Sequence, residues 1–492
     1  MKLARRRLLQ TLGATAATGL ALGSDRAQLQ AQEPATGGPY FLIVLGGTGG
    51  ANIVDSLLAI RQSECTNPAS VYCFPDQVVS DVAGTDFRAV DAGFGSLGAI
   101  PMSFEANQSA FVNKHGQSLM AVTHTGTSVN HAVAQRRAVT GNEAWLGRTL
   151  QEVVAATYGE GFALPNVHLN AEFGFAERGL DETLPAYAFG ETVANPVLWP
   201  LALDPRKGIV GAPNADDLAL ARALRNDVLD PNSQFGKVFA KAARLQHWRH
   251  QRGAPQAGVE AQNLIDKLLL IDDQALLAQY GLKPADDIAA VRQAFPDLES
   301  DPLDAQAALA FLLLKNQVSC TVTLGPSFQA TVDDASAVDV RNPPIAFDFS
   351  HQDHPSTQAF MWQRLFRIAD GLATLLEGVP FGEGSMWDRT MIYFATEFGR
   401  TRSKPGLNAT SFGSGHELNN GSVIMSPLVQ GGRALGGVDL DTGLTYGFDR
   451  QTGDPAPGTT MAESDIFAGI LGALKVDTAG SGLPDVPSMR KS

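Results

Sequence analysis

The sequence predicts an α/β fold in which helices cover both faces of a mostly parallel sheet. Near the start of the chain, the apolar residues 40–45 lead into the glycine-rich turn 46–50, and this strand–turn pattern is typical of a βαβ unit. Further along, short apolar runs alternate with segments of helical periodicity. Alternating strands and helices favour a parallel sheet, because each helix carries the chain back to the edge where the next strand begins.

Short apolar runs of the kind that form buried strands occur at residues 118–123, 318–324, 345–349, 391–395 and 422–429. The carboxyl ends of parallel strands share one edge of a sheet, and this edge is where open α/β sheets bind ligands. We therefore expect the strands that end near residues 45, 349 and 395 to bring the loops 46–52 and 397–401 together.

Helical periodicity is found at residues 53–60, 142–156, 356–377 and 462–474. Residues 165–205 are rich in glycine and proline and are expected to form short strands and loops. Residues 206–315 are largely helical by period and broken by prolines. We interpret them as a helical insertion or subdomain within one domain spanning residues 32–492.

Residues 1–31 are predicted to be an export signal. Arg5, Arg6 and Arg7 precede a short stretch of Ala, Gly, Leu and Thr, which is typical of a bacterial Tat signal. This stretch is too short and too weakly apolar to anchor the chain in a membrane. We therefore expect export by the Tat translocase to the periplasm or beyond the cell, with no membrane span.

The composition is that of a globular protein, with 44% hydrophobic and 18% charged residues. The net charge of -14 argues against nucleic-acid binding. Cys65 and Cys73 are close enough in sequence to form a disulfide in an oxidising compartment, whereas Cys320 is expected to be buried. The glycine turn is not a dinucleotide fingerprint, because Asn52 stands where the third glycine is needed.

The segment Glu-Phe-Gly-Arg-Thr at residues 397–401 directly follows an apolar strand and is the most informative motif. Glu397 and Arg400 should emerge at the carboxyl edge of the sheet, and His416 returns from a Gly/Ser-rich loop. An acid, a guanidinium and an imidazole at this edge suggest a site for an anion, a metal, or both. A structural ion pair beside an ordinary loop histidine is the alternative.

A second cluster follows the strand expected at residues 345–349. It contains the carboxylates of Asp348 and Asp353 and the imidazoles of His351 and His354. These are ligand types for Zn, Mn or Fe. His124 and His131 flank a loop whose Ser and Asn are expected to cap the next helix, and anion binding by its hydroxyls and backbone amides is the alternative. The His247–His250 turn is interpreted as a solvated helix end.

These motifs, in this order, resemble those of the bacterial exported family known as domain of unknown function 1501, which is placed in the alkaline phosphatase and sulfatase superfamily. The matching pieces are the twin-arginine leader, the glycine turn 46–52, Asn130-His131, Thr140-Gly141, residues 145–148, 348–351 and 397–401, and Gly415-His416. The chain departs from the family at Gly49 and Gly415, where an Asp is common, and has one residue more between Asp348 and His351.

The resemblance implies an alkaline-phosphatase-like sandwich that binds one or two metals at its strand ends. By position it makes Asp348, His351, Glu397 and His416 candidate ligands of a divalent metal such as Zn or Mn. Asp353 and His354 form a reserve pair in case the extra residue shifts the register. Arg400 is expected to pair with an anionic group, and Thr48 is the candidate nucleophile.

The function expected from this resemblance is that of an exported, metal-dependent hydrolase of phosphate or sulfate esters, acting on an anionic small molecule or a glycan ester. The alternative is a non-catalytic exported protein that uses the same fold to bind a ligand, glycan or partner. The missing carboxylate at position 49 favours this alternative.

Overall fold

A computed structural model describes residues 38–491 except 95–103, 170–173, 205–206, 208–212, 243–244, 247–248, 250–261, 327–331, 334–336 and 339–345. These residues belong to a compact unit that begins at Gly38. The expected export signal lies outside the described residues, and so do His247, Trp248, His250 and Ile345.

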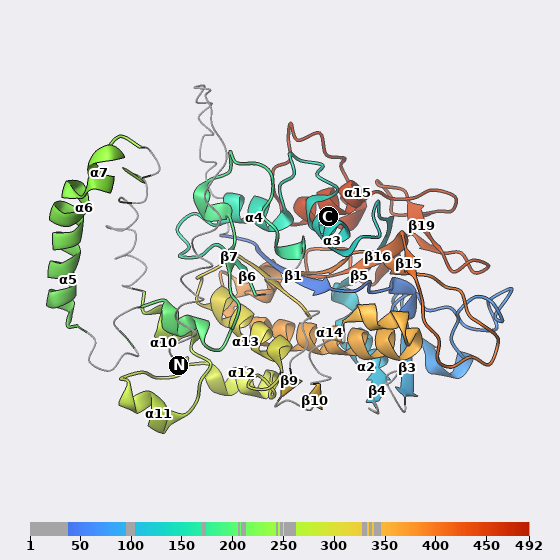
Figure 1. The fold of residues 1–492 in the computed structure, drawn as a ribbon. Coiled ribbons are helices and arrows are strands. Elements are labelled where there is room, and N and C mark those ends of the chain that lie inside the picture. The colour runs from blue at the N-terminus through green and yellow to red at the C-terminus, as the bar shows by residue number, and fades with distance from the viewer. Residues whose placement is uncertain are drawn as a thin grey trace. The chain divides into compact units, whose positions relative to one another are not determined.

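An eight-stranded sheet forms the centre of this unit (Figure 1). Its order is β17 (Arg433–Leu435), β5 (Leu119–Thr125), β16 (Asn419–Met425), β13 (Thr390–Thr396), β1 (Phe41–Gly47), β8 (Thr321–Leu324), β6 (Asn166–His168) and β7 (Glu191–Thr192). Only β16 is antiparallel to its neighbours in this sheet. The predicted α/β class with a mostly parallel sheet is confirmed.

Helices cover both faces of the sheet (Figure 1). Side chains alternate between the two faces along a strand, so Phe41, Ile43 and Leu45 of β1 enter one core while Leu42 and Val44 enter the other. The first core is completed by α13 (Pro302–Lys315) and α14 (His354–Glu377). The second is completed by α3 (His131–Thr140), α4 (Leu150–Tyr158) and α15 (Glu463–Ala473).

Smaller elements surround these layers. The short sheets are formed by β2 (Val79–Asp81), β3 (Arg88–Phe94) and β4 (Phe104–Asn107), by β9 (Val332–Asp333) and β10 (Ala337–Val338), by β11 (Pro380–Phe381) and β12 (Gly384–Ser385), by β14 (Gly399–Arg400) and β15 (His416–Glu417), and by β18 (Gly437–Val438), β19 (Thr445–Phe448) and β20 (Pro455–Ala456). The remaining α-helices are α2 (Gln108–His115), α5 (Ala215–Ala223), α6 (Asp230–Asn232), α7 (Gln234–Val238), α10 (Leu264–Leu268), α11 (Gln274–Gln279) and α12 (Ile288–Ala294).

The expected insertion at residues 206–315 is not uniform. Its last helix, α13, is buried from Leu303 to Leu314 and packs in the main core, so this part belongs to the central fold. In contrast, no described residue of α5 or α6 is buried.

Most of the other expected elements form close to their predicted positions, including β1, β5, β13, β16, α14 and α15. The helix expected at residues 53–60 was a wrong prediction, because only a single 3₁₀ turn, η1 (Ile53–Asp55), forms there. The side chains of Gln358 and Asn420 accept hydrogen bonds from the Asn52 and Ile53 amides, at 3.0 and 3.1 Å. These long-range hydrogen bonds fix the backbone at Asn52 and Ile53, and the local apolar pattern does not predict them.

Two further boundaries differ from prediction. Residues 347–351 form a 3₁₀ helix, η9 (Phe347–His351), instead of ending a strand, and the Phe347 amide donates to Thr48 O at 2.8 Å. The helix expected from residue 142 begins only at Leu150. Gly141 ends α3 in the left-handed conformation, and Asn142 and Glu143 also have positive φ, which a continuing α-helix does not allow.

Candidate metal centre

Several loops meet at the carboxyl edge of the central sheet. The strand β1 ends beside β13, with Gly47 opposite Thr396. The antiparallel strand β16 begins at the same edge, because its Asn419 pairs with the last residue of β5, Thr125. The loops after β1, β5 and β13 and the loop before β16 therefore share one region. The expected meeting of loops 46–52 and 397–401 is seen in the hydrogen bond from Arg400 Nε to Gly49 O at 3.0 Å.

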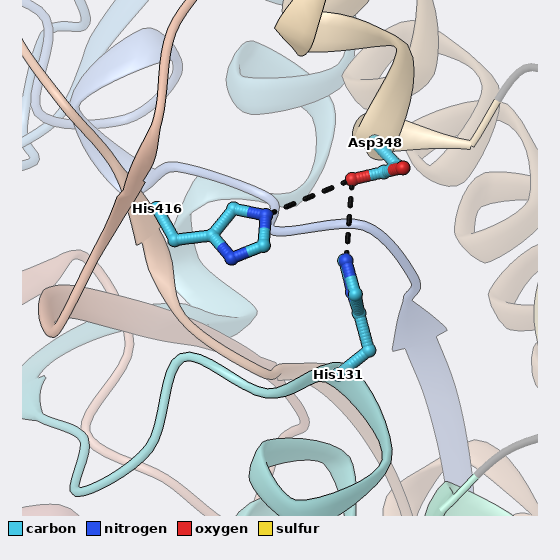
Figure 2. Close-up of side chains that lie close together, drawn as sticks. All are labelled: His131, Asp348 and His416. Atoms are coloured by element: carbon cyan, nitrogen blue, oxygen red, sulfur yellow. Dashed lines mark ion pairs between the residues drawn. The ribbon is translucent and has the colours of Figure 1, made fainter.

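His131, Asp348 and His416 form a group that could hold a metal ion (Figure 2). Asp348 Oδ1 lies 3.3 Å from His131 Nε2 and 3.8 Å from His416 Nε2, and the three ligand atoms lie within 4.8 Å of one another. A tetrahedral ion with bonds of about 2.1 Å separates its ligand atoms by roughly 3.4 Å. The separation of Asp348 and His131 already matches this value, and the remaining separations exceed it by little more than about 1 Å.

The second ring nitrogen of each imidazole is engaged by an oxygen atom. His131 Nδ1 lies 3.1 Å from Glu397 Oε2, and His416 Nδ1 lies 2.8 Å from the carbonyl oxygen of Val129. Partners of this kind orient metal-binding histidines, because they hold the proton on Nδ1 and leave the lone pair on Nε2. Figure 2 shows both rings directed toward the Asp348 carboxylate from different parts of the fold.

Each of the three side chains is placed by a short element. His131 is the first residue of α3, whose cap is Asn130, with its side chain accepting from the Val133 amide at 3.3 Å. His416 lies in β15 opposite Arg400 of β14. Asp348 comes from η9, the segment that is hydrogen-bonded to Thr48 of the glycine turn. The expected helix cap is therefore present, and it also positions His131.

His351 and Arg400 complete the surroundings of Asp348. His351 Nε2 lies 2.9 Å from His416 Nε2 and 3.3 Å from Asp348 Oδ1, and its side chain is 44% exposed. Arg400 is fully buried and its Nη2 donates to Asp348 Oδ1 at 2.9 Å. Arg400 Nη1 has no hydrogen-bond partner among the described residues. The structure thus brings Asp348, His351, His416 and Arg400 together around one carboxylate oxygen.

The charges of this group are strongly coupled. Burial opposes ionisation of Asp348, but hydrogen bonds from His131 and Arg400 prevail and hold its pKa well below the usual range. Burial also lowers the pKa of His131, but its contacts with Asp348 and Glu397 outweigh this effect and raise the pKa to about 9. For His416, burial and the nearby Arg400 lower the pKa to about 4. A metal ion bound between Asp348 and His131 would replace the proton on His131 Nε2 that now faces the carboxylate.

Glu397 and Thr48 lie outside this ligand group. The Glu397 carboxylate is fully buried behind His131, accepts from the Gly49 amide, and has a pKa raised by burial. Thr48 is fully buried, and its hydroxyl has no hydrogen-bond partner among the described residues. The structure thus places Glu397 where it orients the imidazole of His131.

The reserve pair, Asp353 and His354, contacts groups outside the candidate metal centre. Asp353 caps α14, with its Oδ1 accepting from the Ser356 amide at 3.4 Å. His354 is buried beside Asp55 and Ser414.

Sequence reasoning missed His131 as a potential ligand, although it lies directly after the loop that follows β5. Its position beside Asn130 favoured a structural interpretation, and only the tertiary fold places it next to Asp348.

Gly49 cannot carry the Asp that is common in the resembling family. Its φ is +98°, and a Cβ there would overlap the backbone nitrogen of Asp348. The close approach of η9 to the glycine turn therefore requires glycine at position 49.

No protein-family model, curated protein or solved structure matches this chain. The family resemblance therefore stays a prediction from the motifs.

Cys65, Cys73 and Cys320 are all buried, free thiols. Within the described residues, no helix is sufficiently long and apolar to cross a membrane.

Proposed function

We propose that this protein is a Tat-exported, metal-dependent hydrolase of phosphate or sulfate esters with an alkaline-phosphatase-like sandwich fold. The observation that carries the proposal is the pair of imidazoles, His131 and His416, which present Nε2 to the same carboxylate oxygen while their Nδ1 atoms are engaged by oxygen acceptors. Two imidazoles and one carboxylate are a common ligand set of catalytic metal sites with open positions.

His131, Asp348 and His416 would hold a divalent ion such as Zn or Mn, with Glu397 fixing His131. When bound, such an ion supplies Lewis-acid polarisation and activates a nucleophile. His351 is the more exposed neighbour and would complete the coordination shell or face the substrate. Thr48 stays the candidate nucleophile, although its hydroxyl must become accessible to a substrate before it can attack.

Arg400 gives the site its preference for anions. Its Nη2 is bonded to Asp348, while Nη1 retains a donor with no partner among the described residues. Arg400 is fully buried, so Nη1 must become accessible before it can stabilise a phosphate or sulfate oxygen through a charge-assisted hydrogen bond. An anionic small molecule or a glycan ester is therefore the proposed substrate class.

The alternative function is a non-catalytic exported protein that binds a ligand, glycan or partner at this edge of the sheet. Glycine at position 49 favours it, because the first strand contributes no carboxylate to the group. A metal-loaded protein that hydrolyses no ester would support this alternative.

The test measures the metal content of the purified protein and its activity on a panel of aryl phosphate and sulfate esters. We expect about one divalent ion per chain in the wild type, and we expect His416→Ala to bind metal at least about 10-fold more weakly. His115→Ala is the matched control, because His115 is bonded to Asp370 outside this group. Full metal content and unchanged hydrolysis in His416→Ala would contradict the proposed site.

A further inference from the structure

A continuous array of buried polar side chains lies beside the candidate metal centre. His354 Nδ1 lies 2.9 Å from Ser414 Oγ, and His354 Nε2 lies 3.0 Å from Asp55 Oδ2. On its other side, Asp55 Oδ1 accepts from Arg402 Nη1 at 2.8 Å. All four residues are buried, and His354 is fully so. We call Ser414, His354, Asp55 and Arg402 the buried array.

The buried array connects the two segments that supply Asp348 and His416. Ser414 lies two residues before His416, and its amide and hydroxyl both donate to Ser350 O, at 2.8 and 3.3 Å. Ser350 belongs to η9, which also carries Asp348. His354 begins α14 and is separated from the end of η9 by two residues, and its amide donates to Phe412 O at 2.8 Å. The loop before His416 is therefore bonded to η9 and to α14.

His354 is held rigidly within this array. Phe412 stacks on its imidazole with an interplanar angle of 23°, and Tyr72 packs edge-on at 5.3 Å between ring centroids. Asn52 Nδ2 donates to the same Asp55 oxygen that faces His354, at 2.8 Å. Burial opposes ionisation of Asp55, but Arg402 and His354 keep its pKa far below normal. The imidazole therefore faces a fixed anion on one side and the Ser414 hydroxyl on the other.

Serine, histidine and aspartate in a row are also the groups of a nucleophilic triad, in which the serine hydroxyl is exposed to the substrate. Here the Ser414 hydroxyl lies between His354 Nδ1 at 2.9 Å and Ser350 O at 3.3 Å. Ser414 is also only 6% exposed. The array is therefore suited to holding backbone segments in place.

We propose that Ser414 and His354 are positioning residues, which hold the His416 loop against η9 so that His416 and Asp348 stay at metal-binding separation. This inference rests on the proposed function, because it assigns the array a role in metal affinity. Groups hydrogen-bonded to metal ligands typically change metal affinity 10–100-fold when they are removed, and Ser414 and His354 act on the ligands through the backbone of the two segments, so we expect the lower end of this range.

The test titrates the full chain with Co²⁺ and records the visible absorption, which reports coordination geometry. Ser414→Ala removes a single oxygen atom, and Ser414→Thr is its matched control because it keeps the hydroxyl. His354→Asn retains a hydrogen-bonding amide near the Nδ1 position, whereas His354→Gln places its amide near the Nε2 position. Amide hydrogen exchange of residues 411–417 is measured on the same variants without metal.

We expect Ser414→Ala and His354→Gln to bind Co²⁺ about 10-fold more weakly, with an altered spectrum and faster exchange in residues 411–417. Ser414→Thr and His354→Asn should bind Co²⁺ and exchange amide hydrogens as the wild type does. If a His354 variant fails to fold, the Ser414 pair decides the outcome. If the wild type binds Co²⁺ and Ser414→Ala binds it with the same affinity, only this inference is overturned. A wild type that binds no Co²⁺ or Zn²⁺ would overturn the proposed function and the inference with it.

Discussion

Two regions of this protein combine the same chemical groups with opposite degrees of burial. In the candidate metal centre, the Asp348 carboxylate faces Arg400 and three histidines and is 34% exposed. In the buried array, the Asp55 carboxylate faces Arg402 and His354 and is 1% exposed. A carboxylate, a guanidinium and an imidazole therefore do not identify a functional site by themselves.

The difference between the regions lies in how the partners are used. Both oxygens of Asp55 are engaged, Oδ1 by Arg402 and Oδ2 by Asn52, so no position is left for a ligand. The interactions of Asp348 instead converge on Oδ1, to which His131, His351 and Arg400 all lie within 3.3 Å. A metal ion can replace protons in the second arrangement but has no place in the first.

The largest expected difference is in stability. Asp55→Ala leaves Arg402 buried without its carboxylate, which should reduce the free energy of unfolding by about 3–5 kcal/mol. Asp348→Ala should cost no more than about 2 kcal/mol, because the Asp348 carboxylate is partly exposed and the charge of Glu397 stays near Arg400. Urea unfolding of both variants, followed by circular dichroism, measures the difference. Equal losses would show that the two regions are both structural.

A smaller effect is expected at Glu397, which distinguishes an orienting group from a ligand. Glu397→Gln keeps the size of the side chain and an oxygen acceptor for His131 Nδ1 but removes the negative charge. We expect metal affinity to fall by about 10-fold while one ion per chain is still bound at saturation. Isothermal titration with Zn²⁺ gives both the affinity and the stoichiometry. Complete loss of binding would make Glu397 a direct ligand, as first predicted from the sequence.

The smallest effect is expected at a third carboxylate, Asp370, which is partly exposed and lies further along α14. A hydrogen bond from His115, aided by Lys114, lowers the pKa of Asp370 to about 2 although burial opposes the shift. In an unfolded chain the pKa is about 3.9. The folded-state pKa is depressed, so this contact stabilises the protein fully above about pH 4 and is lost as the pH falls toward 2.

The side chain of Asp370 is 41% exposed, so the contribution should be below about 1 kcal/mol. Asp370→Asn should therefore lower the free energy of unfolding slightly at pH 7 and by less at pH 3. Urea titrations at the two pH values provide the measurement, and an equal loss at both would contradict the assignment.

The sequence alone was sufficient for the features that depend on local pattern. Apolar runs identified β1, β5 and β13, the amphipathic segment identified α14, and their alternation identified a mostly parallel sheet. Because strand ends share an edge, the same reasoning placed Glu397 and Arg400 at the carboxyl edge of the sheet, whereas Asp348 and His351 were expected at the end of a strand that residues 347–351 do not form.

Only the tertiary structure decided which of these groups face one another. The antiparallel direction of β16 brings His416 to the carboxyl edge, and the cap of α3 turns His131 toward Asp348. Residues 53–55 and 347–351 depart from their local patterns because distant groups, Asn420 and Thr48, take their amide hydrogen bonds. A local pattern specifies which face of an element is apolar. Long-range hydrogen bonds and backbone packing, such as that between Gly49 and Asp348, determine where a side chain at the end of that element lies.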